Sequence, residues 1–222
     1  MSSVAKTRII VLHLTKYSDH ALILHTIDSA AGRRSFLVRG IKRGNAVAMF
    51  HPLSLLDIVS AESPKSTLAW LREWEPATAL PGIRSDQLKA AVAMFVSEVL
   101  YRSFTTELAD QTLFDWLCDA IVRLDTAGGS IANFHLWFLA GYAVQLGFMP
   151  GETVEPSGLF SSEETTLFYQ ILRGNFEETL ALPLSAARRQ AFARRMLQYL
   201  SWHLGTTLDA RSLDVLHAVL QD

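Results

Sequence analysis

The 222-residue sequence is poor in cysteine, and Cys118 is its single thiol. One thiol excludes a disulfide within the chain, and it excludes a zinc site of four cysteines or of two cysteines and two histidines. Cys118 lies in a helical pattern, and no histidine partner for a nucleophile can be recognised near it. We therefore expect Cys118 to be a small buried apolar side chain, and we expect no metal site.

Long uninterrupted apolar runs are also lacking. The start, MSSVAKTRIIVLHLTKYS, is broken by polar residues and has no signal-peptide cleavage site. The most apolar stretch, IANFHLWFLAGYAVQLGFMPG, is short for a membrane span and contains Asn133, His135 and Gln145. A buried core helix fits this stretch better, so the sequence predicts a cytoplasmic protein without membrane contact.

The sequence lacks the common motifs of catalysis and cofactor binding. It contains no GxxxxGK[ST], no GxGxxG and no HExxH. The adjacent carboxylates Glu163 and Glu164 point away from each other on a helix and make a poor acid/base pair. His135 is expected to be a core histidine rather than a metal ligand. We therefore expect no enzyme and no cofactor, although a hydrolase site assembled from distant helices remains an alternative.

Charge, in contrast, is unevenly distributed. Residues 1–50 contain eight lysines and arginines against two acids, a net charge of +6, whereas the whole chain carries −2. The remaining residues therefore carry −8. Such an imbalance indicates a polyanion-binding N-terminal part. A chance distribution of solvated charges is the alternative.

The N-terminal part has the pattern of β-structure. Apolar and polar residues alternate over residues 7–17, and we expect Ile10, Leu12 and Leu14 to share one face and Ile9 and Val11 the other. Turn signals separate further strands, which are expected at residues 21–28, 33–42, 52–61 and 67–75. Five short antiparallel strands over about 70 residues are typical of a closed OB-fold barrel.

The period becomes helical beyond the Pro-containing stretch 76–81. Helices are expected at residues 85–105, 110–124 and 131–147, from Ser161 or Ser162 to about Gly174, and at residues 185–204 and 210–220. The fold class is therefore α+β. We expect an OB-fold nucleic-acid-binding domain over residues 1–79 and an α-helical, partner-binding domain without a zinc module over residues 80–222.

The expected barrel combines basic residues with a few aromatic ones, as OB-folds that bind single-stranded nucleic acid do. Tyr17, Phe36 and Phe50 are the stacking candidates, and Phe36 is more often a core residue in such a pattern. The expected DNA-binding residues are Lys16, Arg33, Arg34, Arg39, Lys42 and Arg43. The main alternative is a scaffold whose barrel binds an acidic protein instead of DNA.

A second basic cluster lies in the helical part. The favoured interpretation is a solvated helix face. The functional alternative is a pocket in which guanidinium groups receive a partner's carboxylates beside an apolar slot. The candidate partner-binding residues are Arg188, Arg189, Arg194 and Arg195.

Several stretches together resemble the RecO family of bacterial recombination mediators. They are IIVLHLTKYSDHALILHTI, GRRSFLVRGIKRG and HPLSLLDIV in the β part, and MFVSEVLYRSF, LFDWLCDAIVRLD and ANFHLWFLAGYAVQLGFMP in the helical part. The resemblance covers nearly the whole chain in order. The most specific pieces are Arg39-Gly40, Ser97-Glu98, Asn133-Phe134-His135 and the LGFMP exit at residues 146–150.

The resemblance implies an N-terminal OB-fold followed by a helical domain. It implies binding to single- and double-stranded DNA, annealing of complementary strands, and a contact with the acidic C-terminal tail of the single-strand binding protein. It also implies a complex with RecR that helps to load RecA. Some members carry a four-cysteine zinc module, which this chain cannot build.

Overall fold

The computed structural model describes residues 4–39, 49–62, 68–105, 108–150 and 158–220. Its contacts divide the chain into two compact units. The barrel unit comprises Met1–Pro81 and Phe104–Val122, and the helical unit comprises Gly82–Ser103 and Arg123–Asp222. The sequence-based boundary between residues 79 and 80 remains a prediction.

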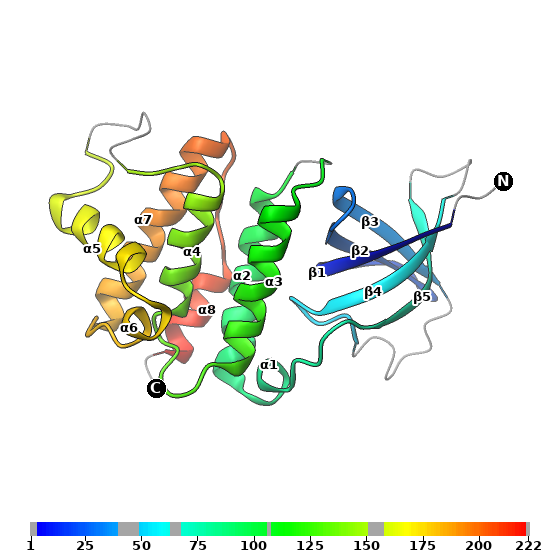
Figure 1. Ribbon diagram of the computed structural model, residues 1–222, viewed down its shortest axis with the longest axis horizontal. Helices are drawn as coiled ribbons and strands as arrows, with labels where there is room; N and C mark the ends of the chain where they lie inside the picture. Colours follow the sequence, from blue (N-terminus) through cyan, green and yellow to red (C-terminus); the bar gives the residue numbers. More distant parts are fainter. Residues whose placement is uncertain (1–3, 40–48, 63–67, 106–107, 151–157, 221–222) are drawn as a thin grey trace. The chain divides into compact units, whose positions relative to one another are not determined.

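Five strands form the closed barrel that the alternating pattern predicted. They are β1 (Val4–Ser18), β2 (Ala21–Asp28), β3 (Gly32–Arg39), β4 (Leu55–Ala61) and β5 (Ala69–Pro76). Their order around the barrel is β1-β2-β3-β5-β4, drawn in blue to cyan in Figure 1. All neighbours are antiparallel except β3 and β5, whose parallel pairing closes the barrel. The OB-fold class is confirmed, and closure leaves no long unpaired edge between these strands.

The barrel core is filled from alternate positions of all five strands. Phe36, Val38 and Leu24 are fully buried in it, together with Ile9 and Val11. Leu14 packs against the same core, which corrects the face expected for it. The reason is a register shift in β1 between Val11 and His13, because one extra residue reverses the face of everything after it.

The fourth strand begins later than its apolar run suggests. Leu53 is buried but has a φ of 63°, in the left-handed region that interrupts a strand. Its N–H donates to the Val11 carbonyl oxygen at 2.8 Å, opposite the irregularity in β1. The regular ladder therefore starts at Leu55 instead of residue 52.

The helical unit has the following helices: α1 (Pro81–Ser85), α2 (Gln87–Ser103), the end of α3 (Gln111–Thr126), α4 (Phe134–Gln145), α5 (Ser162–Arg173), α6 (Phe176–Leu180), α7 (Ala186–Leu204) and α8 (Ser212–Val219). The α4 helix packs against α5, α6 and α7, and α2 packs against α8, as Figure 1 shows. The five-residue helix α1 was not predicted, because one turn carries no apolar period. The adjacent carboxylates Glu177 and Glu178 lie in the first turn of α6, in keeping with the helix start that such a pair indicates.

The helix ends follow their local chemistry. Ser161 caps α5 in a capping box with Glu164, and Asn175 caps α6 in the same way with Glu178. Ser185 accepts a hydrogen bond from the N–H of Arg188 at the start of α7. Gly205 ends α7 in the left-handed conformation, directly after the end expected for this helix at residue 204.

Buried polar residues connect the helices. The Asn133 amide donates to the carbonyl oxygens of Thr179, Leu180 and Leu182 at 2.9–3.2 Å, which fixes the chain after α6. The Glu98 carboxylate on α2 accepts hydrogen bonds from the N–H and hydroxyl of Ser212 at the start of α8. These contacts give a structural role to two of the sequence pieces on which the family resemblance rests.

Candidate nucleic-acid interface

The strand alternation of β3 turns its even-numbered apolar residues inward and its odd-numbered residues outward. Phe36 and Val38 are completely buried in the core, whereas Arg39, at the end of the strand, is exposed. The core position of Phe36 is confirmed, so it cannot be a stacking platform. Phe50 is also a core residue, 2% exposed, and only Tyr17 among the three aromatic candidates is open to solvent.

An indole with two guanidinium groups close to its ring stands out on the outer face of the barrel. Leu37 on β3 lies opposite Trp70 on β5, so Arg39, two residues further along β3, reaches the indole ring. The Arg39 guanidinium carbon lies 4.5 Å from the Trp70 ring centroid, and that of Arg72 lies 5.5 Å from it. We call these three residues the Arg-Trp face.

The two arginines of the Arg-Trp face are exposed and carry uncompensated charge. Within the described parts of the chain, neither Arg39 nor Arg72 forms an ion pair with a carboxylate. Trp70 is half-buried, so its ring is held in place while part of its surface stays accessible. A positive charge of two beside an aromatic ring is the combination that binds a phosphate backbone and an unpaired base.

Lys16 lies near the same end of the barrel. It lies close to the end of β1, two residues before Ser18. Across the sheet, Ser18 on β1 pairs with Ala21 on β2, and Ala21 pairs with Arg39 on β3. Its Nζ contacts Asp19 Oδ1 at 2.9 Å, and both side chains are largely exposed. Such a surface pair contributes little free energy, so Lys16 can exchange Asp19 for a phosphate.

Arg33 and Arg34 lie at the beginning of β3, and the structure gives both of them intramolecular partners. The Arg34 guanidinium lies 3.6 Å from Asp28 and 3.3 Å from Glu62, and its side chain is only 23% exposed. Arg33 Nη1 donates to the carbonyl oxygen of Phe104 at 3.3 Å. The predicted cations are thus not one cluster, and a role for Arg33 and Arg34 in DNA binding remains a prediction.

The other two predicted cations, Lys42 and Arg43, lie outside the described residues, as does most of the loop expected at residues 43–51. Trp70 and Arg72 were missed by sequence reasoning. The sequence contains only a weak indication that Trp70 and Arg72 share the outer face of one strand. The two residues are separated by one position and alternate with Ala69 and Leu71, which are buried. Their closeness to Arg39 depends on the parallel β3–β5 pairing, which sequence does not reveal.

The isolated titratable groups have the properties of packed side chains. Cys118 is only partly buried, which corrects the buried position expected for it, since the exposed Asp115 and Asp119 lie beside it on α3. Partial burial still raises the pKa of its thiol to about 11, which keeps it protonated and unreactive near neutral pH. Burial lowers the pKa of His135 to about 3, with a contribution from the Arg189 charge, so this core histidine is neutral.

In the described residues no three histidine, cysteine or carboxylate groups come together as metal ligands. Over the same residues, no helix is long and apolar enough to cross a membrane.

The four arginines of α7 divide between two faces of the helix. Arg188 and Arg195 contact Glu163 and Glu164 of α5 at 3.9 Å and 3.4 Å. Arg194 contacts Asp214 of α8 at 2.7 Å, and Arg189 donates to the carbonyl oxygen of Leu184 at 2.6 Å. A role in binding a partner remains a prediction for all four.

Comparison with known proteins supports the resemblance of the chain, barrel included, to the RecO family. The family described as "Recombination protein O N terminal" matches residues 1–80, and "Recombination protein O C terminal" matches residues 84–155. The chain belongs to the RecO family. A "DNA repair protein RecO" from Flavobacterium psychrophilum is 31% identical, with 96% of this chain and 98% of the relative covered.

Further RecO relatives match over similar lengths. The protein from Bacteroides fragilis is 30% identical over 95% of this chain and 97% of its own length, and that from Porphyromonas gingivalis is 29% identical over 89% and 91%. Membership of the RecO family indicates a role in DNA repair and recombination. The RecO resemblance stated from the sequence is therefore confirmed, whereas the DNA contacts and partners of this chain are matters for proposal.

Proposed function

We propose that this RecO protein binds single- and double-stranded DNA through the outer face of its barrel and anneals complementary strands. The observation that carries the proposal is the Arg-Trp face, in which Arg39 and Arg72 flank the ring of Trp70 at 4.5 Å and 5.5 Å. The guanidinium groups neutralise phosphates, and the indole or a guanidinium plane stacks with an unpaired base.

The further cations would extend this surface. Lys16 lies near Arg39, and Lys42 and Arg43 follow it in sequence, so a strand leaving the Arg-Trp face would meet more positive charge. Arg33 and Arg34 would contribute mainly through long-range electrostatic attraction, since their guanidinium groups already contact other residues of this chain. Contacts of this kind carry little sequence preference, which suits a protein that handles any pair of complementary strands.

Annealing by this route needs no catalytic group. Cations on one surface reduce the repulsion between two phosphate backbones, and base pairing supplies the free energy of the step. We therefore propose a mediator without enzymatic activity, cofactor or nucleotide requirement. It would act in the cytoplasm at the nucleoid, in keeping with a DNA substrate.

The helical unit is proposed to contact proteins. By analogy with the family, the partners are RecR and the acidic C-terminal tail of the single-strand binding protein, and together they help to load RecA. Arg188 is the best placed of the four α7 arginines for an acidic tail, because its 3.9 Å contact is to Glu163, an 84% exposed side chain. Arg189, Arg194 and Arg195 have closer partners and would have to exchange them.

The test is an annealing assay with two complementary oligonucleotides, one carrying a donor and one an acceptor fluorophore, without nucleotide. The wild type should accelerate the rise in energy transfer, and Arg39→Glu/Arg72→Glu should remove at least about nine-tenths of that acceleration, as expected from losing two phosphate contacts. Arg173→Glu/Arg211→Glu makes the same charge change in the helical unit and should leave annealing nearly unchanged.

An unaccelerated reaction with the wild type would rule out annealing by this chain alone. Equal acceleration by the wild type and the barrel variant would place the annealing surface elsewhere. The barrel would then be better explained as a scaffold for an acidic protein, since Arg39 and Arg72 can receive carboxylates as well as phosphates.

A further inference from the structure

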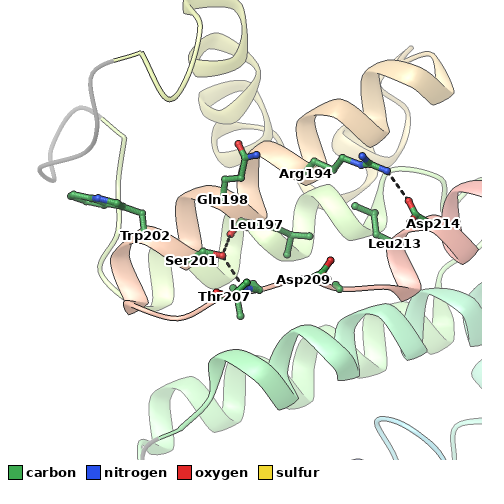
Figure 2. Close-up of a pocket in the computed structure, with 11 residues that line it drawn as sticks. Arg194, Leu197, Gln198, Ser201, Trp202, Thr207, Asp209, Leu213 and Asp214 are labelled. Carbon is green, nitrogen blue, oxygen red and sulfur yellow. Dashed lines mark hydrogen bonds and ion pairs between the residues drawn. The ribbon is translucent and has the colours of Figure 1, made fainter.

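A groove in the helical unit is formed by the C-terminal half of α7 and the segment that leads into α8 (Figure 2). Its volume is about 610 Å³. Leu197, Leu208 and Leu213 line it and are at least 95% buried, so the groove has a fixed apolar lining. The groove belongs to one unit of the protein and shares no residue with the Arg-Trp face.

The segment from Thr207 to Ala210 has the alternation of a β-strand but no strand partner. Thr207 and Asp209 are exposed, and Leu208 and Ala210 are buried. The segment is attached to α7 at its start, since Leu208 donates to Ser201 Oγ at 3.0 Å and the preceding Thr206 donates to the Ser201 carbonyl oxygen at 3.1 Å.

The outward N–H groups of this segment are available. Those of Thr207 and Asp209 donate no hydrogen bond to any residue that the structure describes. An exposed extended segment with alternate unpaired donors is the feature to which an extended peptide adds as a further strand.

The charges around the groove favour a cationic ligand. Asp214 accepts hydrogen bonds from Arg194 at 2.7 Å and from Gln190 at 3.4 Å, so the positive charge of Arg194 is compensated. Asp209 has neither an ion pair nor a side-chain hydrogen bond with another described residue. The side chains that line the groove therefore carry a net charge of −1, and Asp209 is the charged group among them that has no ion pair with a described residue. Arg211, an exposed cation two residues further on, does not line the groove.

Trp202 adds an aromatic surface to the groove. Its side chain is 44% exposed although it is a large hydrophobic group, and it packs edge-on against His203. In Figure 2 the indole lies at the opposite end of the groove from the Arg194–Asp214 pair. Tryptophan is the best of the aromatic rings for binding a cation and also provides apolar contact area.

We propose that this groove binds an extended peptide segment of a partner protein that carries lysine or arginine next to apolar residues. The peptide backbone pairs with the N–H groups of Thr207 and Asp209. A cationic side chain binds the Asp209 carboxylate, and an apolar side chain packs between Trp202 and the leucine lining. The interaction is independent of DNA binding and distinct from any contact of an acidic tail at Arg188.

The test uses synthetic peptides as probes and fluorescence anisotropy with the full chain. One labelled heptapeptide alternates lysine with leucine and valine, and the second has glutamate at every lysine position. The lysine peptide should bind at least about tenfold more tightly, since the same charges meet Asp209 attractively in one case and repulsively in the other. Methylating alternate backbone nitrogens of the lysine peptide should abolish binding if its backbone pairs with the groove.

Variants locate the site. Asp209→Asn should weaken the lysine peptide about fivefold, as loss of one exposed charge pair does, and Trp202→Ala should weaken it at least as much. Glu177→Gln removes an exposed charge on α6 and should have no effect. Trp70→Ala is the matched tryptophan control from the barrel. Trp202→Phe retains an aromatic ring if the alanine variant fails to fold.

Three results would overturn the proposal. One is tighter binding of the glutamate peptide, which would make the groove an acidic-peptide site. Another is the absence of lysine-peptide binding up to about 1 mM, the weakest useful affinity. The last is binding that neither Asp209→Asn nor the Trp202 variants change, which would place the peptide elsewhere on the chain.

Discussion

At the scale of single residues, Trp70 is the side chain on which the proposed DNA contact depends most. Electrostatic attraction alone would not distinguish single strands from other polyanions, whereas an aromatic ring can stack only on an accessible base. The flanking guanidinium groups of Arg39 and Arg72 keep the ring in a positive field. The three residues together would account for the proposed single-strand binding without any base-specific hydrogen bond.

We expect Trp70→Ala to weaken binding of a labelled single-stranded oligonucleotide about tenfold, because one base–aromatic stack contributes about 1–3 kcal/mol. Binding of a fully paired duplex of the same length should change less, since its bases are not available for stacking. Fluorescence anisotropy measures both affinities. Trp202→Ala, which removes an exposed tryptophan from the helical unit, is the control and should bind DNA as the wild type does.

Arg34 provides a contrast between a structural and a binding arginine. Its guanidinium faces the Asp28 carboxylate, which is 1% exposed and has no hydrogen bond to Oδ2 in the described structure. Arg34→Met should therefore reduce the free energy of unfolding by about 2 kcal/mol, because it leaves a buried carboxylate without its cation. Arg39→Met should change it by less than about 0.5 kcal/mol. Urea unfolding measures both, and equal losses would contradict the distinction.

At the scale of elements, the sequence was sufficient for the strands and long helices but not for their local irregularities. The strand expected at 21–28 matches β2, and the strand expected at 33–42 matches β3 as far as Arg39, after which the chain lies outside the described residues. The helix expected at 185–204 matches α7. The face of Leu14 was predicted wrongly, because the register shift in β1 leaves no signature in residue type. The Arg39–Trp70 contact was out of reach for a similar reason, since strand order around a barrel is set by tertiary packing.

The clamp between α2 and α8 should make stability depend on acid pH. Burial would raise the pKa of Glu98, but the hydrogen bonds from Ser212 and Arg102 outweigh it and lower the pKa below its ordinary value of 4.5. A carboxyl group with a lowered folded-state pKa stabilises the fold above its unfolded-state pKa. That stabilisation is lost as the pH falls through the folded-state value.

We therefore expect Glu98→Gln to cost about 1–2 kcal/mol at pH 7, where the charge-assisted hydrogen bonds are present, and we expect this cost to shrink progressively as the pH falls from the ordinary value of 4.5 through the lowered folded-state pKa. Chemical unfolding of the wild type and the variant at pH 7 and across this acid range measures the difference. Gln111→Glu, which adds a carboxyl group at an exposed position, is a control for the general effect of charge. A cost that is the same at all these pH values would show that Glu98 acts through packing and not through its charge.

At the scale of the whole molecule, charge is divided as the sequence analysis found, with +6 over residues 1–50 and a net −2 for the chain. The positive charge belongs to the N-terminal strands and not to the barrel unit as a whole, which is neutral once its acidic segment 104–122 is included. The helical unit carries −2, and several of its charges are paired internally. Membership of the RecO family indicates a role in DNA repair and recombination, to which we propose that the barrel contributes DNA binding and the helical unit contributes protein binding.

The central claim is that the Arg-Trp face is the DNA-binding surface. The most direct test is the anisotropy of a labelled single-stranded oligonucleotide, titrated with protein at several salt concentrations. The wild type should lose affinity steeply with salt. Arg39→Glu/Arg72→Glu should bind more than about tenfold more weakly, with a log–log salt slope shallower by roughly 1.4, the value for two lost phosphate contacts. If this variant binds as the wild type and Arg173→Glu/Arg211→Glu do, with the same slope, the Arg-Trp face is not the DNA-binding surface.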